Sequence, residues 1–158
     1  MGNIFMIDRI DLRILRHLQQ DATLPLHELA ERVSLSKNPC WRRLQKLQQQ
    51  GYIKKQVAIL NAKKLNVGVT VFVNVRTNQH SADWLKRFAD VVNAIPEVVE
   101  FYRMSGTVDY MLKVVVPTIE AFDVVYKRMI SHIDIYDVSS YFAMEELKNT
   151  TELPLSYL

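Results

Sequence analysis

The sequence predicts an α+β protein with an N-terminal winged helix-turn-helix and a C-terminal ferredoxin-like domain of βαββαβ order. Three helical patterns, with a three-residue turn before the third, occupy residues 7–60. Residues 69–158 follow the order strand, helix, strand, strand, helix, strand, and 61–68 are polar enough for a hinge. The charge balance changes at the same place, since residues 1–60 hold ten Lys and Arg against five Asp and Glu, whereas 61–158 hold ten against twelve.

Two short helices are predicted first. Residues 8–20 carry apolar side chains at helical spacing. Asp8 and Asp11 stand in the first turn, where the positive end of the helix dipole favours acids. Residues 26–33 repeat the apolar stripe over a shorter length, which predicts the second helix.

A third helix follows the turn at 34–36. Ser36 or Asn38 can cap its start. Gly51 is a standard residue just beyond a helix C-terminus, so the helix is predicted to end before it. Residues 52–60 alternate enough between apolar and polar side chains to predict a small wing strand.

The second half alternates between strand and helix patterns. The strand pattern at 69–76 places four valines on one face, and Ser81 and Thr118 are suited to cap two helices. The predicted strands lie at 69–76, 98–104, 109–116 and 138–147, and the predicted helices at 82–95 and after Thr118. The predicted inward side chains are Trp84 or Leu85, Phe88, Val91 or Val92 and Ile95 in the first of these helices, and Ile119, Phe122, Tyr126 and Met129 in the second.

Helices can cover only one face of such a sheet, so the other face stays open. That face carries Phe72 and one residue from each of the pairs Phe101/Tyr102, Tyr110/Met111 and Tyr141/Phe142. Exposed aromatic area on this scale usually marks an interface. We therefore predict that the sheet packs against a second copy of itself in a two-fold dimer.

Composition indicates an ordinary globular protein. The chain has 158 residues, of which 49% are hydrophobic and 23% are charged. Cys40 is the only cysteine, so no intrachain disulfide can form, and we interpret it as a small core residue in a reducing compartment. Residues 1–6 lack the apolar core of a secretory signal, and the apolar stretches are far shorter than the ~18 residues of a membrane helix. The sequence therefore predicts a cytoplasmic protein with no membrane partner.

One long run of the sequence is basic and contains no acid. Between Glu31 and Asp83 there are ten Lys and Arg and no Asp or Glu. Six of the ten lie within 37–55, around the third predicted helix. A helix whose charges have one sign attracts a polyanion.

Double-stranded DNA is the polyanion that this helix suits. Arginine can bond guanine through two hydrogen bonds, asparagine and glutamine can do so with adenine, and basic side chains neutralise phosphates. The helix would span ~21 Å, a length that suits a major groove. The predicted DNA-binding residues are Lys37, Asn38, Trp41, Arg42, Arg43, Gln45 and Lys46 on the helix, with Lys54 and Lys55 as phosphate contacts on the wing.

Three of these residues have a structural alternative. Arg43 and Lys46 lie towards the flank of the helix, where a solvent or salt-bridge role is also open. Trp41 can instead pack on a neighbouring helix.

Signals for catalysis are weak. The four glycines include no phosphate-binding loop motif, and the four histidines show no metal-ligand spacing. No nucleophile with a base and an orienting group can be nominated. We expect no catalytic residue, no metal and no cofactor.

Motifs run through nearly the whole chain. They are I7-D-x-x-D-x-x-I-L-x-x-L18, L29-A-E, L35-S-x-x-P-C-W-R-R-L-x-x-L47, G51-Y-I, P96-E-V, M104-S-G-T-V-D-Y-M-L112 and F142-A-M-E-E-L-K148. In combination they resemble the Lrp/AsnC family of leucine-responsive, or feast/famine, transcription factors. The resemblance implies a sequence-specific transcriptional regulator in which a winged helix-turn-helix is joined to an amino-acid-sensing domain. It also implies dimers, and often octamers made of four dimers, whose assembly and DNA binding respond to the effector.

The resemblance also implies an effector site between neighbouring subunits. The hairpin turn with the family's G-x-x-D-Y motif would line it, which here means Ser105, Gly106, Thr107, Val108, Asp109 and Tyr110. Asp109 either receives an α-ammonium group or caps the turn. Two departures lie near this site. The last strand begins V138-S-S140 where the family commonly has T-x-T, so only Ser140 matches a hydroxyl donor, and the loop 132–137 lacks the usual Pro-Gly.

Two alternatives come from other classes of protein. The sirohaem decarboxylases share the two-domain plan and use it for tetrapyrrole chemistry, but no distinctive haem-handling histidine pair stands in this sequence. The other alternative is a dimeric sensor whose helix-turn-helix binds protein rather than DNA.

Overall fold

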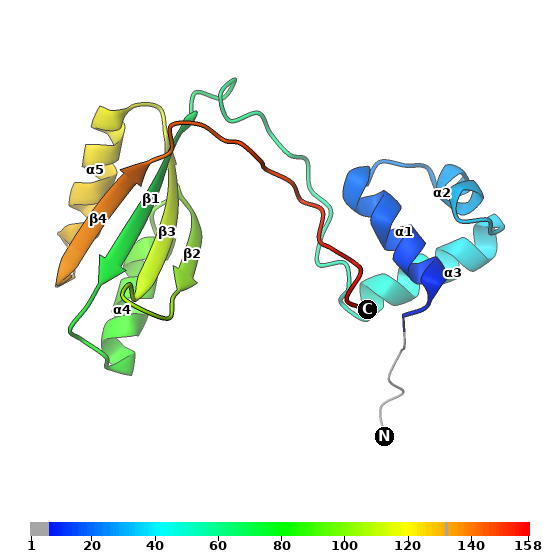
Figure 1. Cartoon of the computed structure of the whole chain (residues 1–158), viewed down its shortest axis with the longest axis horizontal. Coiled ribbons are helices and arrows are strands. Elements are labelled where there is room, and N and C mark those ends of the chain that lie inside the picture. Colours follow the sequence, from blue (N-terminus) through cyan, green and yellow to red (C-terminus); the bar gives the residue numbers. More distant parts are fainter. Residues whose placement is uncertain (1–6, 132) are drawn as a thin grey trace. The chain divides into compact units, whose positions relative to one another are not determined.

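The computed structural model describes residues 7–131 and 133–158, and its α+β architecture agrees with the sequence prediction (Figure 1). The chain divides into two compact units, one made of the residues up to Ala58 together with Lys148–Leu158 and the other of Ile59–Leu147. The first unit contains helices α1 (Arg9–Gln20), α2 (Leu26–Arg32) and α3 (Lys37–Gln49). The second contains β1 (Val69–Arg76), α4 (Ala82–Asn93), β2 (Val98–Arg103), β3 (Tyr110–Val116), α5 (Ile119–Ile130) and β4 (Asp137–Phe142).

The exclusion of a membrane helix and the interpretation of Cys40 as a core residue can be compared with the structure. None of the helices in the described part of the chain is long and apolar enough to cross a bilayer. Residues 1–6, where the sequence predicts no secretory leader, lie outside the described residues. Cys40 is fully buried, and burial raises the pKa of its thiol, which agrees with a core residue rather than a reactive one.

A buried cluster to which all three helices contribute holds the first unit together. Ile14 of α1, Leu29 of α2 and Leu47 of α3 are each at most 1% exposed. Leu15, Ala30, Val33 and Cys40 complete the cluster. Burying one such aliphatic side chain contributes ~1.5–3 kcal/mol. The cluster therefore stabilises helices that are too short to persist alone.

Two backbone hydrogen bonds close the turn between α2 and α3. Ser34 has a left-handed backbone with φ of 60°. Its N–H donates to the Glu31 carbonyl at 3.0 Å, and the Leu35 N–H donates to the Ala30 carbonyl at 2.9 Å, so the last carbonyls of α2 are satisfied. Ser36 then takes the capping position of α3, as predicted, although its hydroxyl makes no capping hydrogen bond. The two helices form the predicted helix-turn-helix.

α3 ends before Gly51, as predicted, and the φ of 77° at that residue favours glycine. The strand predicted at 52–60 does not form, because the segment is irregular chain and takes part in none of the strand pairings of the described residues. Its apolar side chains Val57, Ile59 and Leu60 are 64%, 74% and 69% exposed. An alternating pattern needs a partner strand to become a strand, and this segment has none among the described residues.

The predicted hinge at 61–68 is an ordered turn. The Asn61 side chain accepts a hydrogen bond from the Lys64 N–H at 3.1 Å, and the Val67 N–H donates to the Ala62 carbonyl at 3.0 Å. These bonds give the segment a local structure, and its role as a hinge stays a prediction.

The C-terminal segment differs from the predicted domain boundary. β4 ends at Phe142 rather than at 147, and Lys148–Leu158 belongs to the first unit rather than to a domain spanning 69–158. The Gln19 side chain of α1 accepts a hydrogen bond from the Leu153 N–H at 2.8 Å and donates one to the Leu153 carbonyl at 3.1 Å. Leu155 packs against the core of the unit. The partners are 134 residues apart in sequence, so no local pattern could have predicted this docking.

The second unit is a four-stranded antiparallel sheet with α4 and α5 on one face (Figure 1). The strand order β2-β3-β1-β4 and the order of the elements are those of the predicted ferredoxin-like fold. The central strand β1 pairs with both β3 and β4. Its inward residues Val71, Val73 and Val75 are fully buried in the core beneath the helices. The four-valine face predicted for this strand is therefore its core face.

Both helices of the second unit begin at the predicted capping residues. The Ser81 hydroxyl accepts a hydrogen bond from the Trp84 N–H at 3.2 Å. The Thr118 hydroxyl accepts one from the Ala121 N–H at 3.2 Å. Each bond satisfies a backbone donor that would otherwise lack a partner in the first turn.

The inward stripe is correct for α4 and partly wrong for α5. The buried residues of the first stripe are Trp84, Phe88, Val92 and Ile95. In α5 the buried stripe runs through Phe122, Val125 and Met129. Tyr126 is half-buried against the same core, as predicted, and Val125 is the core residue that the sequence did not indicate. Ile119 is 62% exposed because it stands in the first turn, outside that stripe.

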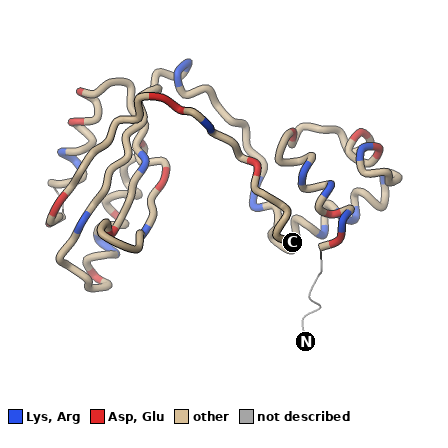
Figure 2. The backbone as a smooth tube through the Cα atoms, viewed as in Figure 1, with Lys and Arg blue, Asp and Glu red and all other residues tan. Residues whose placement is uncertain are grey.

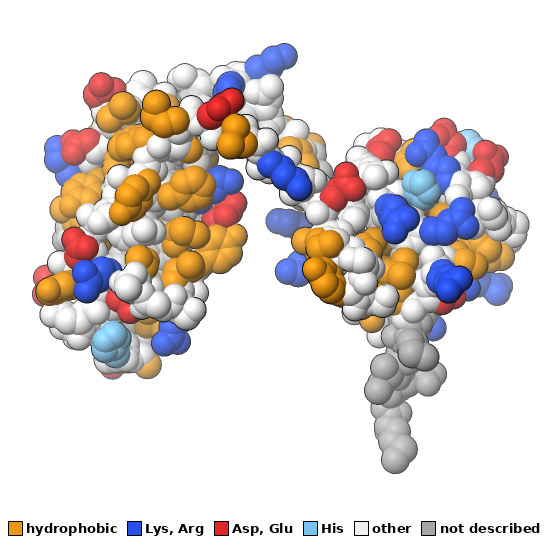
Figure 3. Space-filling model, viewed as in Figure 1, with side chains coloured by type: hydrophobic (Ala, Val, Ile, Leu, Met, Phe, Trp, Pro, Cys, Tyr) orange, Lys and Arg blue, Asp and Glu red, His pale blue; other side chains and the backbone are white. Residues whose placement is uncertain are grey.

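The strand register decides which aromatic side chains lie on the open face. Phe72 of β1 stands between Lys113 of β3 and Tyr141 of β4, and Tyr102 of β2 stands opposite Met111 of β3. These positions alternate with the buried ones and so point away from the helices. Figure 3 shows the hydrophobic side chains that gather on this face of the sheet.

The other member of each pair is packed beneath the helices. Phe101 lies 5.5 Å from Phe88 and Phe142 lies 5.4 Å from Phe122, measured between ring centroids. Tyr110 is 6% exposed among the same rings. The apolar part of the open face therefore consists of Phe72, Tyr102, Met111 and Tyr141 around the ion pair of Lys113 and Glu100, whose charged atoms are 3.1 Å apart.

We expect Phe72→Asp to dissociate the predicted dimer, because it places a charge in the middle of the open face and a buried, unpaired carboxylate is strongly unfavourable. Light scattering at micromolar concentration should return two chains for the wild type, or eight if four dimers assemble. The variant should still be a single chain at concentrations at least about ten times higher than those at which the wild type dissociates.

Val124→Asp is the matched control, since Val124 of α5 is 57% exposed and belongs to a helix on the covered side of the sheet. It should leave the mass unchanged. A monomeric wild-type chain, or a Phe72→Asp chain that keeps the wild-type mass, would contradict the predicted interface.

Candidate nucleic-acid interface and effector site

α3 is anchored from behind and presents its other side to solvent. Cys40 and Leu47 are fully buried, and seven residues correspond to two helical turns, so both face the core. The exposed residues of the helix include Lys37, Asn38, Trp41, Arg42 and Lys46. Figure 2 shows the Lys and Arg positions along this helix, which contains no acid. Five of the seven DNA-binding residues predicted on this helix are therefore exposed.

The exposure of two residues bears on their alternatives. Trp41 is 51% exposed, so it is not packed away against a neighbouring helix. Arg42 is exposed and has neither an ion pair nor a side-chain hydrogen bond with any described residue. Its guanidinium is therefore available to an external acceptor.

Gln45 is half-buried, and its side-chain amide donates to the Gln48 side-chain oxygen at 3.2 Å. Lys54 and Lys55 are exposed in the irregular chain that follows α3. Ile53, next to them, packs against the core of the first unit, so the start of this segment is held to the unit.

Arg43 forms the salt bridge that the sequence left open as its alternative role. Its Nη1 donates to the Asp8 carboxylate at 2.6 Å and to the Asp11 carboxylate at 2.8 Å. Its side chain is 31% exposed, and that of Asp11 is 1% exposed. A guanidinium that neutralises a buried carboxylate cannot leave it for DNA without stranding that charge. The structure therefore contains the salt-bridge alternative, and a DNA contact of Arg43 stays a prediction.

Asp8 belongs to the start of α1 as well as to this ion pair. Its carboxylate accepts the backbone N–H groups of Ile10 at 2.8 Å and Asp11 at 2.9 Å. Desolvation by burial raises the pKa of Asp8, but the hydrogen bonds from the Asp11 N–H and the Arg43 guanidinium outweigh it, so the pKa lies below its ordinary value of 3.8.

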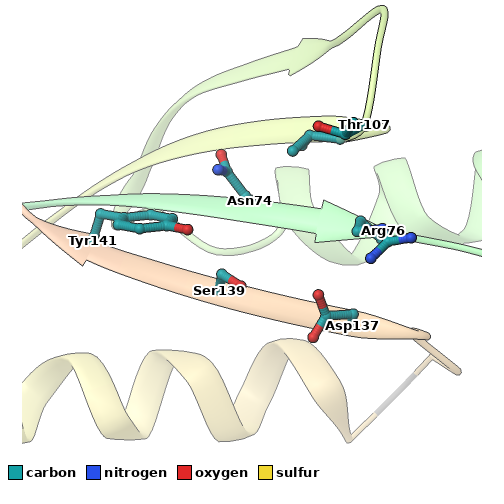
Figure 4. Close-up of a pocket in the computed structure, with 7 residues that line it drawn as sticks. Asn74, Arg76, Thr107, Asp137, Ser139 and Tyr141 are labelled. Atoms are coloured by element: carbon teal, nitrogen blue, oxygen red, sulfur yellow. The ribbon is translucent and has the colours of Figure 1, made fainter.

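A shallow polar hollow of about 170 Å³ lies on the open side of the second unit. It is lined by Asn74, Arg76, Thr107, Val108, Asp137, Ser139 and Tyr141. Arg76 of β1 is the register partner of Asp137 of β4. Figure 4 shows Arg76 and Asp137 towards one end and Tyr141 towards the other, with Asn74 and Ser139 between them.

The hollow has two charges of opposite sign on adjacent strands. Arg76 can hold a carboxylate and Asp137 can hold an ammonium group, while Asn74 and Ser139 supply neutral hydrogen-bonding groups. The Arg76 guanidinium carbon also lies 5.7 Å from the centroid of the Tyr136 ring, which orients it from one side. This arrangement suits a small zwitterion.

Only part of the predicted effector set reaches the hollow. Thr107 and Val108 line it. Ser105 and Gly106 are exposed in the hairpin turn, where the φ of 113° at Gly106 favours glycine. Tyr110 belongs to the aromatic core instead.

Asp109 acts as a structural residue of the hairpin. Its carboxylate accepts the Thr77 N–H at 2.8 Å, its N–H donates to the Val75 carbonyl at 3.0 Å, and its carbonyl accepts the Met104 N–H at 2.8 Å. These bonds favour the turn-capping alternative over an ammonium-binding role.

Ser139, rather than Ser140, is the serine of the hollow. Ser140 is the register partner of Val73, and paired residues share a face, so it lies on the helix-covered side. The register likewise brings in Asn74, Arg76, Asp137 and Tyr141, which the sequence analysis missed. Alternation within 69–76 did place Asn74 and Arg76 opposite the valines, but the neighbours of that face depend on strand pairing. In the loop 132–137, His132 lies outside the described residues.

The described residues contain no group of His, Cys, Asp and Glu side chains that could hold a metal ion. The polar groups of both candidate sites are instead suited to hydrogen bonds and ion pairs with organic or phosphate partners.

Comparison with known proteins matches both units. Residues 7–54 match the winged helix-turn-helix DNA-binding family, and 70–153 match the Lrp/AsnC ligand binding domain. The chain is 48% identical over 149 residues to the glutamate uptake regulatory protein of Zymomonas mobilis, covering 94% of this chain and 91% of that protein.

Two solved structures are similar over nearly the whole chain. An AsnC family transcriptional regulator from Agrobacterium tumefaciens has a TM-score of 0.93 at 60% identity, covering 96% of this chain and 99% of that one. A transcriptional regulator from Neisseria meningitidis in complex with L-Met has a TM-score of 0.91 at 35% identity, with the same coverage. These relatives are named as regulators, not enzymes, which agrees with the sequence prediction.

The lowered pKa of Asp8 predicts an acid-sensitive first unit. Its contribution is complete above the ordinary pKa of 3.8 and is lost as the pH falls through the lower folded value. Asp8→Asn should lower the free energy of unfolding at neutral pH. On acidification below about pH 4, that free energy should fall less in the variant than in the wild type. Urea unfolding followed by the NMR amide signals of α1 measures both. Asp90→Asn, on α4, should reproduce the wild-type profile. A wild-type profile for Asp8→Asn would contradict the assignment.

Proposed function

The chain belongs to the Lrp/AsnC family of DNA-binding transcriptional regulators, and from this premise we propose that α3 reads DNA bases and that the hollow receives an amino acid. The main support for DNA reading is the exposed side of α3. It contains Lys37, Asn38, Trp41 and Arg42, and the helix has no acidic residue. Members of this family bind amino-acid effectors and oligomerise.

Residues of α3 divide by chemistry into base readers and phosphate contacts. Arg42 and Asn38 can form the paired hydrogen bonds that distinguish guanine and adenine in the major groove. Lys37 and Lys46 neutralise phosphates, as do Lys54 and Lys55 beyond the helix. Trp41 adds an exposed ring for apolar contact with a thymine methyl group or a sugar.

A two-fold dimer would place two copies of α3 in successive major grooves. The half-sites would then lie about one helical turn, ~34 Å, or a multiple of it apart on a pseudo-palindromic operator. Four such dimers would form an octamer in which contacts between effector domains set the favoured spacing of DNA sites. The cytoplasm, where the chromosome of a bacterial relative lies, is the compartment that this role requires.

The hollow supports an amino-acid effector through its pair of charges. Arg76 would bind the α-carboxylate and Asp137 the α-ammonium group, leaving the side chain of the ligand towards Asn74, Ser139 and Tyr141. The Neisseria meningitidis regulator, whose structure contains L-Met, is a relative that holds an amino acid.

Neither alternative function has an observation in its favour. The tetrapyrrole-modifying enzyme gains nothing from the relatives, which are named as regulators. A protein-binding helix-turn-helix would not need the exposed, acid-free basic surface of α3, and the next experiment separates it from the DNA reading.

Arg42→Ala should weaken specific DNA binding by about tenfold or more, since a base-contacting arginine is worth ~1–3 kcal/mol. A gel-shift titration against the promoter of its own gene, repeated at several salt concentrations, measures this. Affinity should fall steeply with salt, by about 0.9 in the log–log slope for each neutralised phosphate.

Arg87→Ala is the control, because Arg87 is an exposed arginine of α4 in the second unit. It should leave affinity and salt slope unchanged. Equal affinities of the Arg42→Ala and wild-type chains would remove Arg42 from the base readers, and a flat salt dependence would argue against DNA as the partner.

Thermal unfolding in the presence of each of the twenty amino acids should identify the effector. A ligand at a hundred times its Kd stabilises the folded state by ~2.7 kcal/mol, which raises the melting temperature of a small domain by several degrees. Arg76→Gln and Asp137→Asn should each weaken that ligand at least about tenfold, because each removes a charge-assisted hydrogen bond of ~1.5–3 kcal/mol.

The control variants are Lys86→Gln and Asp90→Asn, which remove the same kinds of charge from α4. They should leave the ligand-induced rise in melting temperature unchanged. If the ligand raises the melting temperature of both hollow variants as much as that of the wild type, the effector binds elsewhere.

A further inference from the structure

The N-terminus of α1 and the middle of α3 are joined by three charged residues, which we call the carboxylate clasp: Asp8, Asp11 and Arg43. One nitrogen of the guanidinium, Nη1, donates to both carboxylates, at 2.6 and 2.8 Å. The carboxylates also bond each other's backbone, since Asp8 accepts the Asp11 N–H at 2.9 Å and Asp11 accepts the Asp8 N–H at 3.2 Å. The clasp is therefore one connected network rather than a loose surface pair.

Burial places this network inside the first unit. The Asp11 side chain is 1% exposed, the Arg43 side chain 31% and the Asp8 side chain 49%. Asp11 has no access to an external ligand, so its charge can act only through its internal partners. The network runs from a buried carboxylate out to the flank of α3.

Arg43 lies three residues after Cys40 and four before Leu47, the two fully buried anchors of α3. Spacings of three and four residues bring side chains to one side of a helix. The three residues thus hold the same side of α3 along two turns. Arg42, one residue earlier, lies about 100° around the helix at ~3.6 residues per turn and is exposed.

We propose that Arg43 is a positioning residue for DNA recognition, which fixes the rotation of α3 about its own axis through the carboxylate clasp and does not itself contact DNA. Two apolar anchors tolerate rotation because their contacts have no direction, whereas a bridged ion pair has a defined geometry. The inference rests on the proposed function of α3 as the base-reading helix.

A small rotation matters at the base edges. With side chains extending ~5–6 Å from the helix axis, a turn of about 10° displaces their tips by on the order of 1 Å. Recognition groups must be held to within ~0.5 Å and 10–20° to act. Loosening the clasp should therefore lower DNA affinity through Arg42 and its neighbours, even though no clasp residue is lost from the contact surface.

The test compares Asp11→Asn and Arg43→Lys with the wild type in DNA titrations at several salt concentrations. Asp11→Asn removes a negative charge, so a purely electrostatic effect would strengthen binding to a polyanion. Positioning predicts the opposite, a loss of about tenfold in affinity with an unchanged salt slope. Arg43→Lys should keep most of the affinity, because a single nitrogen already bridges both carboxylates.

A base-reading or phosphate-binding Arg43 predicts another pattern. Asp11→Asn would then leave binding equal or stronger. Arg43→Lys would lose base discrimination, because the flexible ammonium of lysine does not reproduce the planar guanidinium fork of arginine. Arg43→Gln would reduce the salt slope by about 0.9. Any of these results would overturn the proposal.

Stability is separated from positioning by measuring affinity at a temperature where hydrogen exchange shows α1 and α3 folded. If Asp11→Asn lowers only the melting temperature and leaves affinity unchanged, the clasp is merely structural and the proposal fails. Should Asp11→Asn not fold, the double variant Asp11→Asn/Arg43→Gln replaces the ion pair by two neutral amides and makes the same prediction.

Arg42→Ala distinguishes failure of this inference from failure of the proposed function. If Arg42→Ala weakens binding and Asp11→Asn does not, the positioning role alone is wrong. If neither changes binding, α3 is not the reading helix. With the clasp disrupted, Arg42→Ala should cost less than in the wild type, because a misplaced side chain has less to lose.

Discussion

Burial of one side of each functional element is the constraint on which both units depend. α3 can present a polar surface because Cys40 and Leu47 hold its other side in the core. β1 can present Phe72, Asn74 and Arg76 because its alternate valines are covered by helices. A helix turns its side chains by about 100° per residue and a strand by about 180°, so each element exposes a defined set once its apolar set is buried. The proposed recognition surfaces of this protein are therefore the sides of α3 and β1 that face away from the cores.

The distribution of internal ion pairs separates charges that stabilise the fold from charges available to partners. Arg43 is held by Asp8 and Asp11, and Lys113 of the open face is paired with Glu100. Arg42, adjacent to Arg43 in sequence, has no such partner among the described residues. An arginine beside a buried carboxylate stabilises the fold, whereas one on an acid-free surface can neutralise a phosphate or read a base. Two neighbouring arginines therefore have different surroundings, and we propose different roles for them.

More of the residues of the α3 site than of the hollow could be predicted from the sequence. For α3 the acid-free run, the helical spacing and the capping and terminating residues placed Lys37, Asn38, Trp41 and Arg42 correctly on exposed surface, because all these signals are local. For the hollow, the sequence predicted only two of the lining residues, Thr107 and Val108 of the hairpin. Its other residues come from β1 and β4, and their meeting depends on a register that a single strand does not encode. Ser140 shows the consequence, since a displacement of one residue puts it on the opposite face from Ser139.

The sequence by itself determined the order of the elements, the capping residues Ser81 and Thr118, the valine face of β1 and the basic side of α3. Each of these follows from periodicity or from contacts within a few residues. Only the tertiary structure decided that Arg43 belongs to the carboxylate clasp, that 52–60 is not a strand, and that Leu153 and Leu155 dock onto the first unit. Those outcomes depend on partners distant in sequence, or on a partner strand that is missing, and local pattern contains neither. Packing of the cores determines which distant surfaces meet. Long-range hydrogen bonds and ion pairs therefore depend on the folded structure of each unit and not on local sequence.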